Sequence, residues 1–424
     1  MNKIKWNIII GIVLSAIILD LDRLALYMPI GRVVIFDILT ILFVSMSLLK
    51  IKVFKNNHTL NIYFILMLLL IVYQIISGFI LYQTKINVSY TNIIAVSIKY
   101  LLYLLYTFFV TNYLIDKGYI CKYINIWIYS SIVVIIVGIS QILAINNIPF
   151  FTRYFLWKNI RGGGHRIAAT FRWQGVLVFY LCIVAPLILG KILDNKKAIF
   201  NKRYKDMVLI ILIILVGLYS GSRSVYIVLI SMLLMILLKP FIKDSFKLSF
   251  NKLITIGLFI GSIYHLFTKI IIKSKAVKRI FGLEGAVGVT TGISPRLRII
   301  YASISVWENS PFLGIGSGNL SNIISIASHN AYLEILVENG ILGLTIYILI
   351  IIIFLKIIFF YFIVSINKKE MFPTAIALSL INILLYQFTA SSIQYRLFWA
   401  YLPILFAYHF IYNCEIKDMY IGVK

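Results

Sequence analysis

The sequence predicts an all-α polytopic membrane protein with about twelve transmembrane helices. Of the 424 residues, 61% are hydrophobic and only 13% are charged, and the mean hydropathy is +0.98. Soluble domains are roughly 45–50% apolar, so this composition excludes an ordinary soluble protein. The apolar residues also fall into runs of about 20, the length that a bilayer core of roughly 30 Å requires.

The expected spans follow one another along the whole chain, which is expected to form a single integral membrane domain over residues 1–424. They lie at 7–20, 30–49, 62–82, 93–114, 124–144, 174–192, 206–219, 223–240, 252–272, 340–364, 373–391 and 396–413. Leu19, Asp20 and Leu21 follow the first run where a signal peptide would have small residues, so this run is expected to be retained.

The cysteines and the lysines of the chain support two further inferences. The three cysteines have no paired spacing, which favours neither a disulfide framework nor a metal site. One set of connections is rich in lysine, such as Lys50, Lys52 and Lys55, and Lys196 and Lys197. The positive-inside rule places this set in the cytoplasm together with both termini.

The opposite face is also cationic, but its cations are mostly arginine. They are Arg23, Arg32, Lys85, Arg153, Lys158, Arg161, Arg166, Arg172, Arg223, Lys273, Lys275, Lys278, Arg279, Arg296, Arg298 and Arg396. The planar guanidinium matches phosphate oxygens in a bidentate manner, which indicates a phosphorylated ligand outside. The alternative is that lysine reflects codon usage while arginine serves structural ion pairs.

Two outer connections are long enough to carry function: residues 145–173, and residues 273–339 between the ninth and tenth spans. The first contains RGGGHRIAATFR, residues 161–172, whose glycines let backbone N–H groups approach an anion while Arg161, Arg166 and Arg172 supply charge. A flexible turn with solvated arginines is the alternative.

The stretch YSGSRSVY, residues 219–226, interrupts an apolar region with Arg223. An ionisable residue at membrane depth is a functional candidate by default. The alternative is a tight outer hairpin at Gly221 from which Arg223 reaches the lipid headgroups.

Residues 294–319 begin a helix near Pro295 and Arg296, and they end in a Gly314, Gly316 and Gly318 turn that lacks the Lys-Ser/Thr of a P-loop. Next, SHNAYLEILVENG, residues 328–340, leads into an apolar span. If Ser328 caps this helix, His329 lies in its first turn as a neutral imidazole that can accept a proton. Asn330, Glu334 and Glu338 recur every four residues and share a face.

These motifs together resemble the O-antigen ligase and polymerase (Wzy-type) family. The likeness rests on Ser222-Arg223 at a span junction, Arg296 before Pro311 and the glycine turn, and the His329 to Leu333 segment with Glu338, Gly340 and Gly343. The segment from Arg166 to Gly175 resembles an upstream family element, although Trp173-Gln174 replaces its usual Pro-Asn.

The resemblance implies a metal-independent glycosyltransferase whose active face is extracytoplasmic in the bacterial cell membrane. Its donor and acceptor would be undecaprenyl-diphosphate-linked oligosaccharides, and it would need no cofactor. Direct displacement by an acceptor hydroxyl, with His329 as the candidate general base, would invert the anomeric configuration. The resemblance implies catalytic roles for His329, Arg223 and Arg296. Together with the arginine-rich outer loops, it leads us to expect substrate-binding roles for Arg166, Arg172, Arg161, Arg298, Asn330 and Glu338. Its expected partners are membrane lipids, a flippase and a chain-length regulator, and no nucleic acid.

Within this family a ligase and a polymerase differ in the acceptor, which is lipid A core for the ligase and another lipid-linked repeat unit for the polymerase. The heavy use of Ile, Lys and Asn indicates an AT-rich genome, and we expect a cell without an outer membrane. Such a cell has no lipid A core, so this composition favours a capsule or exopolysaccharide polymerase. A flippase or transporter of the same lipid-linked oligosaccharide is the alternative of another class. Transporters place charges near the midplane, whereas here the cations gather on one face. A structural scaffold would not explain these arginines.

Overall fold

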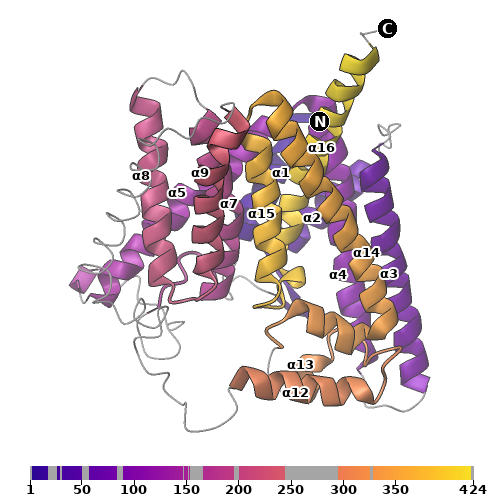
Figure 1. Cartoon of the computed structure of the whole chain (residues 1–424). Helices are drawn as coiled ribbons and strands as arrows, with labels where there is room; N and C mark the ends of the chain where they lie inside the picture. Colours follow the sequence, from indigo (N-terminus) through magenta and orange to yellow (C-terminus); the bar gives the residue numbers. More distant parts are fainter. Residues whose placement is uncertain are drawn as a thin grey trace. The chain divides into compact units, whose positions relative to one another are not determined.

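The computed structural model describes residues 2–17, 26–28, 31–49, 57–83, 89–146, 148–150, 152, 166–194, 200–243, 295–324 and 328–421. These residues are mostly helical (Figure 1). The helices are α1 (Asn2–Ile17), α2 (Ile35–Leu48), α3 (His58–Gln83), α4 (Tyr90–Lys117), α5 (Ile120–Ile145), α7 (Gln174–Asp194), α8 (Phe200–Tyr219), α9 (Val225–Lys243), α12 (Pro295–Glu308), α13 (Leu320–Ile323), α14 (Ala331–Lys368), α15 (Phe372–Tyr386) and α16 (Arg396–Ile421). A small antiparallel hairpin pairs β1 (Leu26–Met28) with β2 (Gly31–Val33), and η3 (Ser392–Gln394) is one 3-10 turn.

Most residues of the expected membrane spans lie in helices where the structure describes them. The main exceptions are residues 31–33, which form β2 within the span expected at 30–49, and residues 387–391, which lie beyond α15 within the span expected at 373–391. Within the described residues, seven helices, α3, α4, α5, α7, α9, α14 and α16, are long and apolar enough to cross a membrane, and α2 and α15 are shorter apolar helices. This confirms an all-α polytopic membrane protein. The span expected at 252–272 lies outside the described residues, and the total of twelve spans stays a prediction.

Helix α3 illustrates why these helices suit a bilayer. Ile65 and Leu69 are 61% and 50% exposed, whereas Leu70 and Ile71 are buried. A helix in lipid satisfies its backbone internally and remains stable with apolar side chains on its outer face as well as its packed face. The exposed isoleucines and leucines are therefore the surface that lipid tails would cover.

The chain forms two compact units, each of which is described by itself. Unit 1 contains Met1–Trp127, Gly292–Ile357 and Leu384–Lys424, and unit 2 contains Ile128–Thr291 and Ile358–Ile383.

A buried polar network holds unit 1 together around Asp37. The Tyr103 hydroxyl donates to Asp37 Oδ1 at 2.6 Å, and Arg396 Nη2 lies 3.3 Å from Asp37 Oδ2. Asp37 also accepts the Val34 N–H at the start of α2. A buried carboxylate needs such partners because its desolvation is otherwise costly. Arg396, which the sequence placed among the outer cations, thus serves a structural ion pair.

In unit 2, α7 is almost entirely buried and packs against α8 and α9. Asp194 at its C-terminal end accepts the backbone N–H groups of Met371 and Phe372, both at 2.7 Å, and pairs with Lys243 at 2.9 Å. The free N–H groups at the start of α15 are satisfied in this way. The carboxylate therefore fastens α15 to the buried helix.

Candidate functional site

In unit 1, the predicted glycine turn packs against the first part of α14 (Figure 1). Gly314, Gly316 and Gly318 all have left-handed backbones, with φ of 72°, 81° and 80°. The N–H groups of Ile315 and Gly316 donate to the carbonyls of Val337 and Glu338 at 3.0 and 2.8 Å. These carbonyls have no helical partner, because the helix is interrupted just after them.

The interruption is at Gly340, which divides α14 into a short segment, 331–339, and a long apolar segment from 341 onward. Gly340 has φ 63° and ψ −172°, a combination that is essentially restricted to glycine. A Cβ at this position would lie 2.1 Å from the Phe312 carbonyl oxygen. The sequence predicts that the apolar span begins at residue 340; the break in the helix falls at this residue, and the start of the membrane span stays a prediction.

Replacing Gly340 by alanine is therefore expected to destabilise the protein by about 3 kcal/mol or more, from the sum of backbone strain and steric overlap. The measurement is the thermal unfolding of the purified protein in detergent. Gly118→Ala is the matched control, since Gly118 has nearly the same φ of 62° but nothing within 4 Å of an added Cβ. Equal destabilisation of the two variants would contradict the proposed close packing at Phe312.

The Glu338 carboxylate binds the same loop from the inside. Glu338 Oε1 accepts the Leu320 N–H at 3.1 Å at the start of α13, and the Glu338 side chain is 5% exposed. Ser317, one turn away in the loop, donates to Asn339 Oδ1 at 2.8 Å. Glu338, predicted to bind substrate, thus also anchors the glycine turn on α14.

His329 lies outside the helix, which corrects the expectation that it occupies the first turn. The helix begins at Ala331, and its cap is Asn330, whose Oδ1 accepts the N–H groups of Tyr332 and Leu333 at 3.0 and 3.1 Å. Asn caps a helix as well as Ser does. Ser328 does not cap because its hydroxyl is used elsewhere.

The backbone of His329 is left-handed, with φ 53°, and its side chain is exposed. A residue other than glycine in this conformation is uncommon, and such residues cluster at functional sites. We call this left-handed turn at His329 the elbow. The helix cap at Asn330 fixes the C-terminal side of the elbow. The fold therefore presents the imidazole at the surface of unit 1 on an anchored turn.

Ser328 holds the other side of the elbow. Its hydroxyl lies 3.0 Å from Glu334 Oε2 and 3.1 Å from the Ser391 hydroxyl. Gln394 Nε2 donates to Glu334 Oε1 at 3.1 Å. These bonds link the start of α14 to the turn before α16, beside His329. The linked residues Ser328 and Ser391 are 63 residues apart in the sequence.

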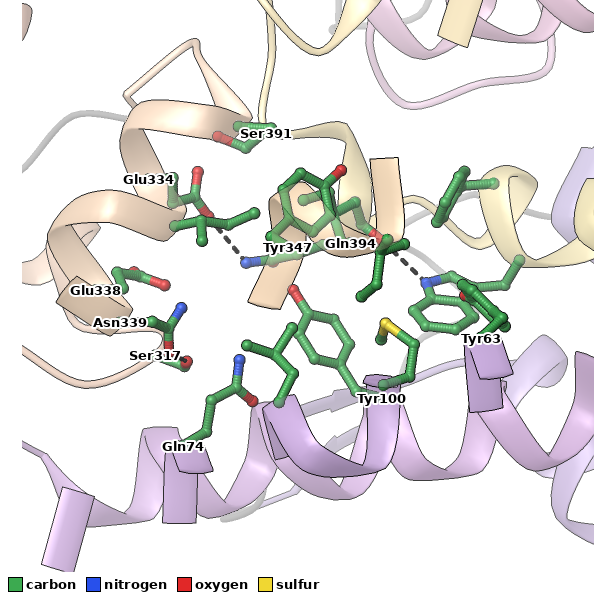
Figure 2. A pocket seen from close by; sticks show the side chains of 18 residues that line it. Tyr63, Gln74, Tyr100, Ser317, Glu334, Glu338, Asn339, Tyr347, Ser391 and Gln394 are labelled. Atoms are coloured by element: carbon green, nitrogen blue, oxygen red, sulfur yellow. Dashed lines mark hydrogen bonds between the residues drawn. The ribbon is translucent and has the colours of Figure 1, made fainter. Parts of the chain in front are cut away.

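A partly open pocket lies next to this network (Figure 2). Ala331, Glu334 and Glu338 line it from α14, and Gln74 and Tyr100 line it from α3 and α4. In Figure 2 the Gln74 side chain points toward Ser317 and Asn339, and the bond between Gln394 and Glu334 closes another side. Glu334 and Glu338 therefore do share a face, as their spacing predicts.

The site residues of the first outer loop lie in unit 2. Gln141 Oε1 accepts the N–H groups of Ala168 and Ala169 at 3.1 and 2.8 Å, and Gln141 Nε2 donates to the Ala169 carbonyl at 3.0 Å. The Ile167 N–H donates to the Tyr219 carbonyl at 3.2 Å. The segment that follows Arg166 is therefore fixed to the end of α8.

Arg166 and Arg223 both lie near the turn between α8 and α9. Gly221 has φ 63°, and a Cβ there would lie 3.1 Å from Arg166 Cγ, so the Arg166 side chain passes directly over this glycine. Arg223 follows two residues later with an exposed side chain, just before the N-terminus of α9. Guanidinium groups and the free N–H groups of a helix start both favour an anion.

The other predicted residues are placed as follows. Arg298 is exposed on α12, whose first residues are Pro295 and Arg296 as expected, and Arg172 stacks its guanidinium 5.1 Å from the Trp173 ring centre. Arg161 lies outside the described residues, and the structure describes the backbone but not the side chain of Arg296. No group of three or more His, Cys, Asp or Glu side chains that could hold a metal occurs in the described part of the chain.

Sequence reasoning missed Gln74, Tyr63 and Gln394 as members of a polar site. The available signal was a glutamine at the middle of an apolar span, since polar groups at membrane depth are costly and usually have a function. Their common pocket depends on contacts between helices far apart in sequence.

Several helices can cross a membrane, one turn carries arginines and another carries an exposed histidine. These features define an integral membrane protein whose polar groups gather at helix ends. Residues 208–348 match the family described as O-Antigen ligase, so this part of the chain is similar to that family. The matched segment includes Arg223, Arg296, His329 and Glu338. No curated protein matches the chain. The family supports transfer of a lipid-linked glycan as the general activity.

Proposed function

We propose that the chain is a polysaccharide polymerase that transfers an undecaprenyl-diphosphate-linked glycan to another lipid-linked repeat unit at the outer face of a bacterial cytoplasmic membrane, with both termini inside. The observation that carries this proposal is the exposed, left-handed His329 within the segment that matches the family. The composition, with its many Ile, Lys and Asn residues, favours a repeat unit over lipid A core as the acceptor.

In the proposed reaction, an acceptor hydroxyl attacks the anomeric carbon of the donor sugar. The new bond joins that carbon to the acceptor oxygen, the bond to the diphosphate breaks, and the hydroxyl proton passes to the His329 imidazole. Direct displacement inverts the anomeric configuration. His329 thus has the role of general base.

Negative charge builds on the departing diphosphate, and fixed guanidinium groups stabilise it. Arg223 and Arg166 support this role, because both lie near the turn before α9. The role of Arg296 follows from the resemblance alone. Each assignment can be tested separately.

The test of the function incubates purified protein with a lipid-diphosphate-linked repeat unit and resolves the products by size. A ladder of longer lipid-linked glycans with inverted linkages is the expected result. With lipid A core supplied as the acceptor in a parallel reaction, a single addition and no ladder would make the protein a ligase, an activity that the family match does not distinguish from that of a polymerase. Passage of the intact donor across proteoliposomes without new glycan would identify a transporter. A product that retains the anomeric configuration of the donor would exclude single displacement.

A further inference from the structure

The pocket of Figure 2 contains two polar atoms that have no hydrogen-bond partner among the described residues. They are Gln74 Oε1 and the Tyr63 hydroxyl, on side chains that are 2% and 1% exposed. Burying a polar atom without a partner costs free energy, because its hydrogen bond to water is lost and not replaced. A bound group in the pocket would supply the missing partner.

The pocket offers an anion no cationic partner. Burial, together with the neighbouring Glu334, raises the pKa of Glu338 to about 8, and burial raises the pKa of Glu334 above its usual value. Glu334 and Glu338 line the pocket, and no lysine or arginine is among the described residues around it. This contrasts with the whole chain, whose formal net charge is +26. A diphosphate would find no lysine or arginine in this lining, so the pocket differs in kind from the arginine turn of unit 2.

The hydrogen bonds of the carboxylates argue against a metal ion as well. Glu338 already accepts the Leu320 N–H, and Glu334 accepts from Ser328 and Gln394. A cation would have to displace these donors. A neutral hydroxyl needs no displacement, since it can donate to Gln74 Oε1. The Tyr63 hydroxyl lies at the other end of the pocket, eleven residues from Gln74 on α3, and is not reached by the same group (Figure 2).

The size of the cavity restricts the group further. The free space inside is about 30 Å³, and one water needs roughly 10–15 Å³, so about two water-sized groups fit. A hydroxymethyl arm has this size, whereas a whole sugar ring does not. The pocket is partly open, so a ring can remain outside, and Tyr100 and Trp399 supply an apolar wall.

We propose that this pocket binds the hydroxymethyl arm of a neutral sugar in the acceptor glycan. The identity of the ligand as an acceptor rests on the proposed function. Its position along the chain agrees, because Ala331 and Glu334, which line the pocket, closely follow His329. The pocket would hold the acceptor sugar by one polar arm while another hydroxyl reacts.

The test is saturation-transfer NMR on the full chain in lipid nanodiscs, with methyl β-D-galactoside, methyl β-D-glucoside and methyl α-D-mannoside as probes. At least one probe is expected to bind, with the strongest transfer to its C6 protons, and its 6-deoxy analogue is expected to bind more weakly. Gln74→Leu should weaken binding about fivefold, the effect of losing one hydrogen bond. Gln83→Leu is the matched control, because Gln83 is exposed on the same helix and does not line the pocket.

Gln74→Leu also removes an unpartnered buried atom, so its melting temperature is expected to stay equal or rise. Tyr63→Phe is a second control, because Tyr63 lies at the other end of the pocket, and it should bind the glycoside as the unchanged protein does (Figure 2). Binding of none of the three glycosides, or unchanged binding in Gln74→Leu, would overturn the pocket assignment. Because this assay requires no transfer, a protein that binds the glycoside through Gln74 but forms no glycan would contradict the proposed function and leave the pocket standing.

Discussion

Replacing His329 by asparagine or glycine is expected to lower the rate of glycan transfer by about 10²- to 10⁴-fold, the usual contribution of a general base. Both replacements tolerate the left-handed backbone at φ 53°, so the elbow and the helix that follows should form normally. Alanine is the poorer choice, because it adds backbone strain to the loss of the imidazole. The measurement is the initial rate of polymer formation, together with the melting temperature of each variant.

The control for this experiment is His58→Asn. His58 is exposed and begins α3 in the same unit, so its replacement removes a comparable imidazole away from the elbow. Its transfer rate should equal that of the unchanged protein. Full transfer activity in a folded His329→Asn variant would remove the base assignment.

Arg223→Ala is expected to lower the transfer rate by about 10²- to 10³-fold, as the loss of one fixed charge-stabilising donor does in other enzymes. Arg223 is exposed at the turn before α9, so truncation of its side chain should leave the packing of unit 2 unchanged. Arg223→Lys should recover only part of the activity, because an ammonium keeps the charge but lacks the bidentate fork.

Lys205→Ala provides the charge-matched control. Lys205 is an exposed cation near the opposite end of α8, in the same unit as Arg223. If both variants lose the same activity, general electrostatic attraction of an anionic substrate explains the result. If Arg223→Ala transfers glycan at the normal rate, Arg223 reaches lipid headgroups, as the alternative interpretation of its position holds.

Much of the helical architecture could be predicted from the sequence because apolar length is a local property. The runs at 62–82 and 93–114 correspond to α3 (His58–Gln83) and α4 (Tyr90–Lys117), and each helix extends beyond its run at both ends. Helix ends extend beyond the apolar run because polar residues continue the backbone hydrogen bonding. The break at Gly340 was not predicted, because a glycine inside a helical pattern is often tolerated without a break; only the change from a polar to an apolar segment was evident from the sequence.

The start of α14 was predicted two residues too early. Ser328 and Asn330 are both good caps, and no local rule decides between them. The choice depends on Glu334 and Ser391, which bind the Ser328 hydroxyl and leave Asn330 to cap the helix.

The sequence alone determined the class of protein, the positions of most helices and the two regions that carry the candidate arginines and histidine, because hydropathy and residue type act over short distances along the chain. Only the tertiary structure decided which polar groups meet. It paired Arg396 with Asp37 across 359 residues, placed Arg166 over Gly221, and brought Gln74 to the pocket of Glu334 and Glu338. The physical reason is that burial selects partners for polar groups by packing between distant helices, which no local pattern encodes.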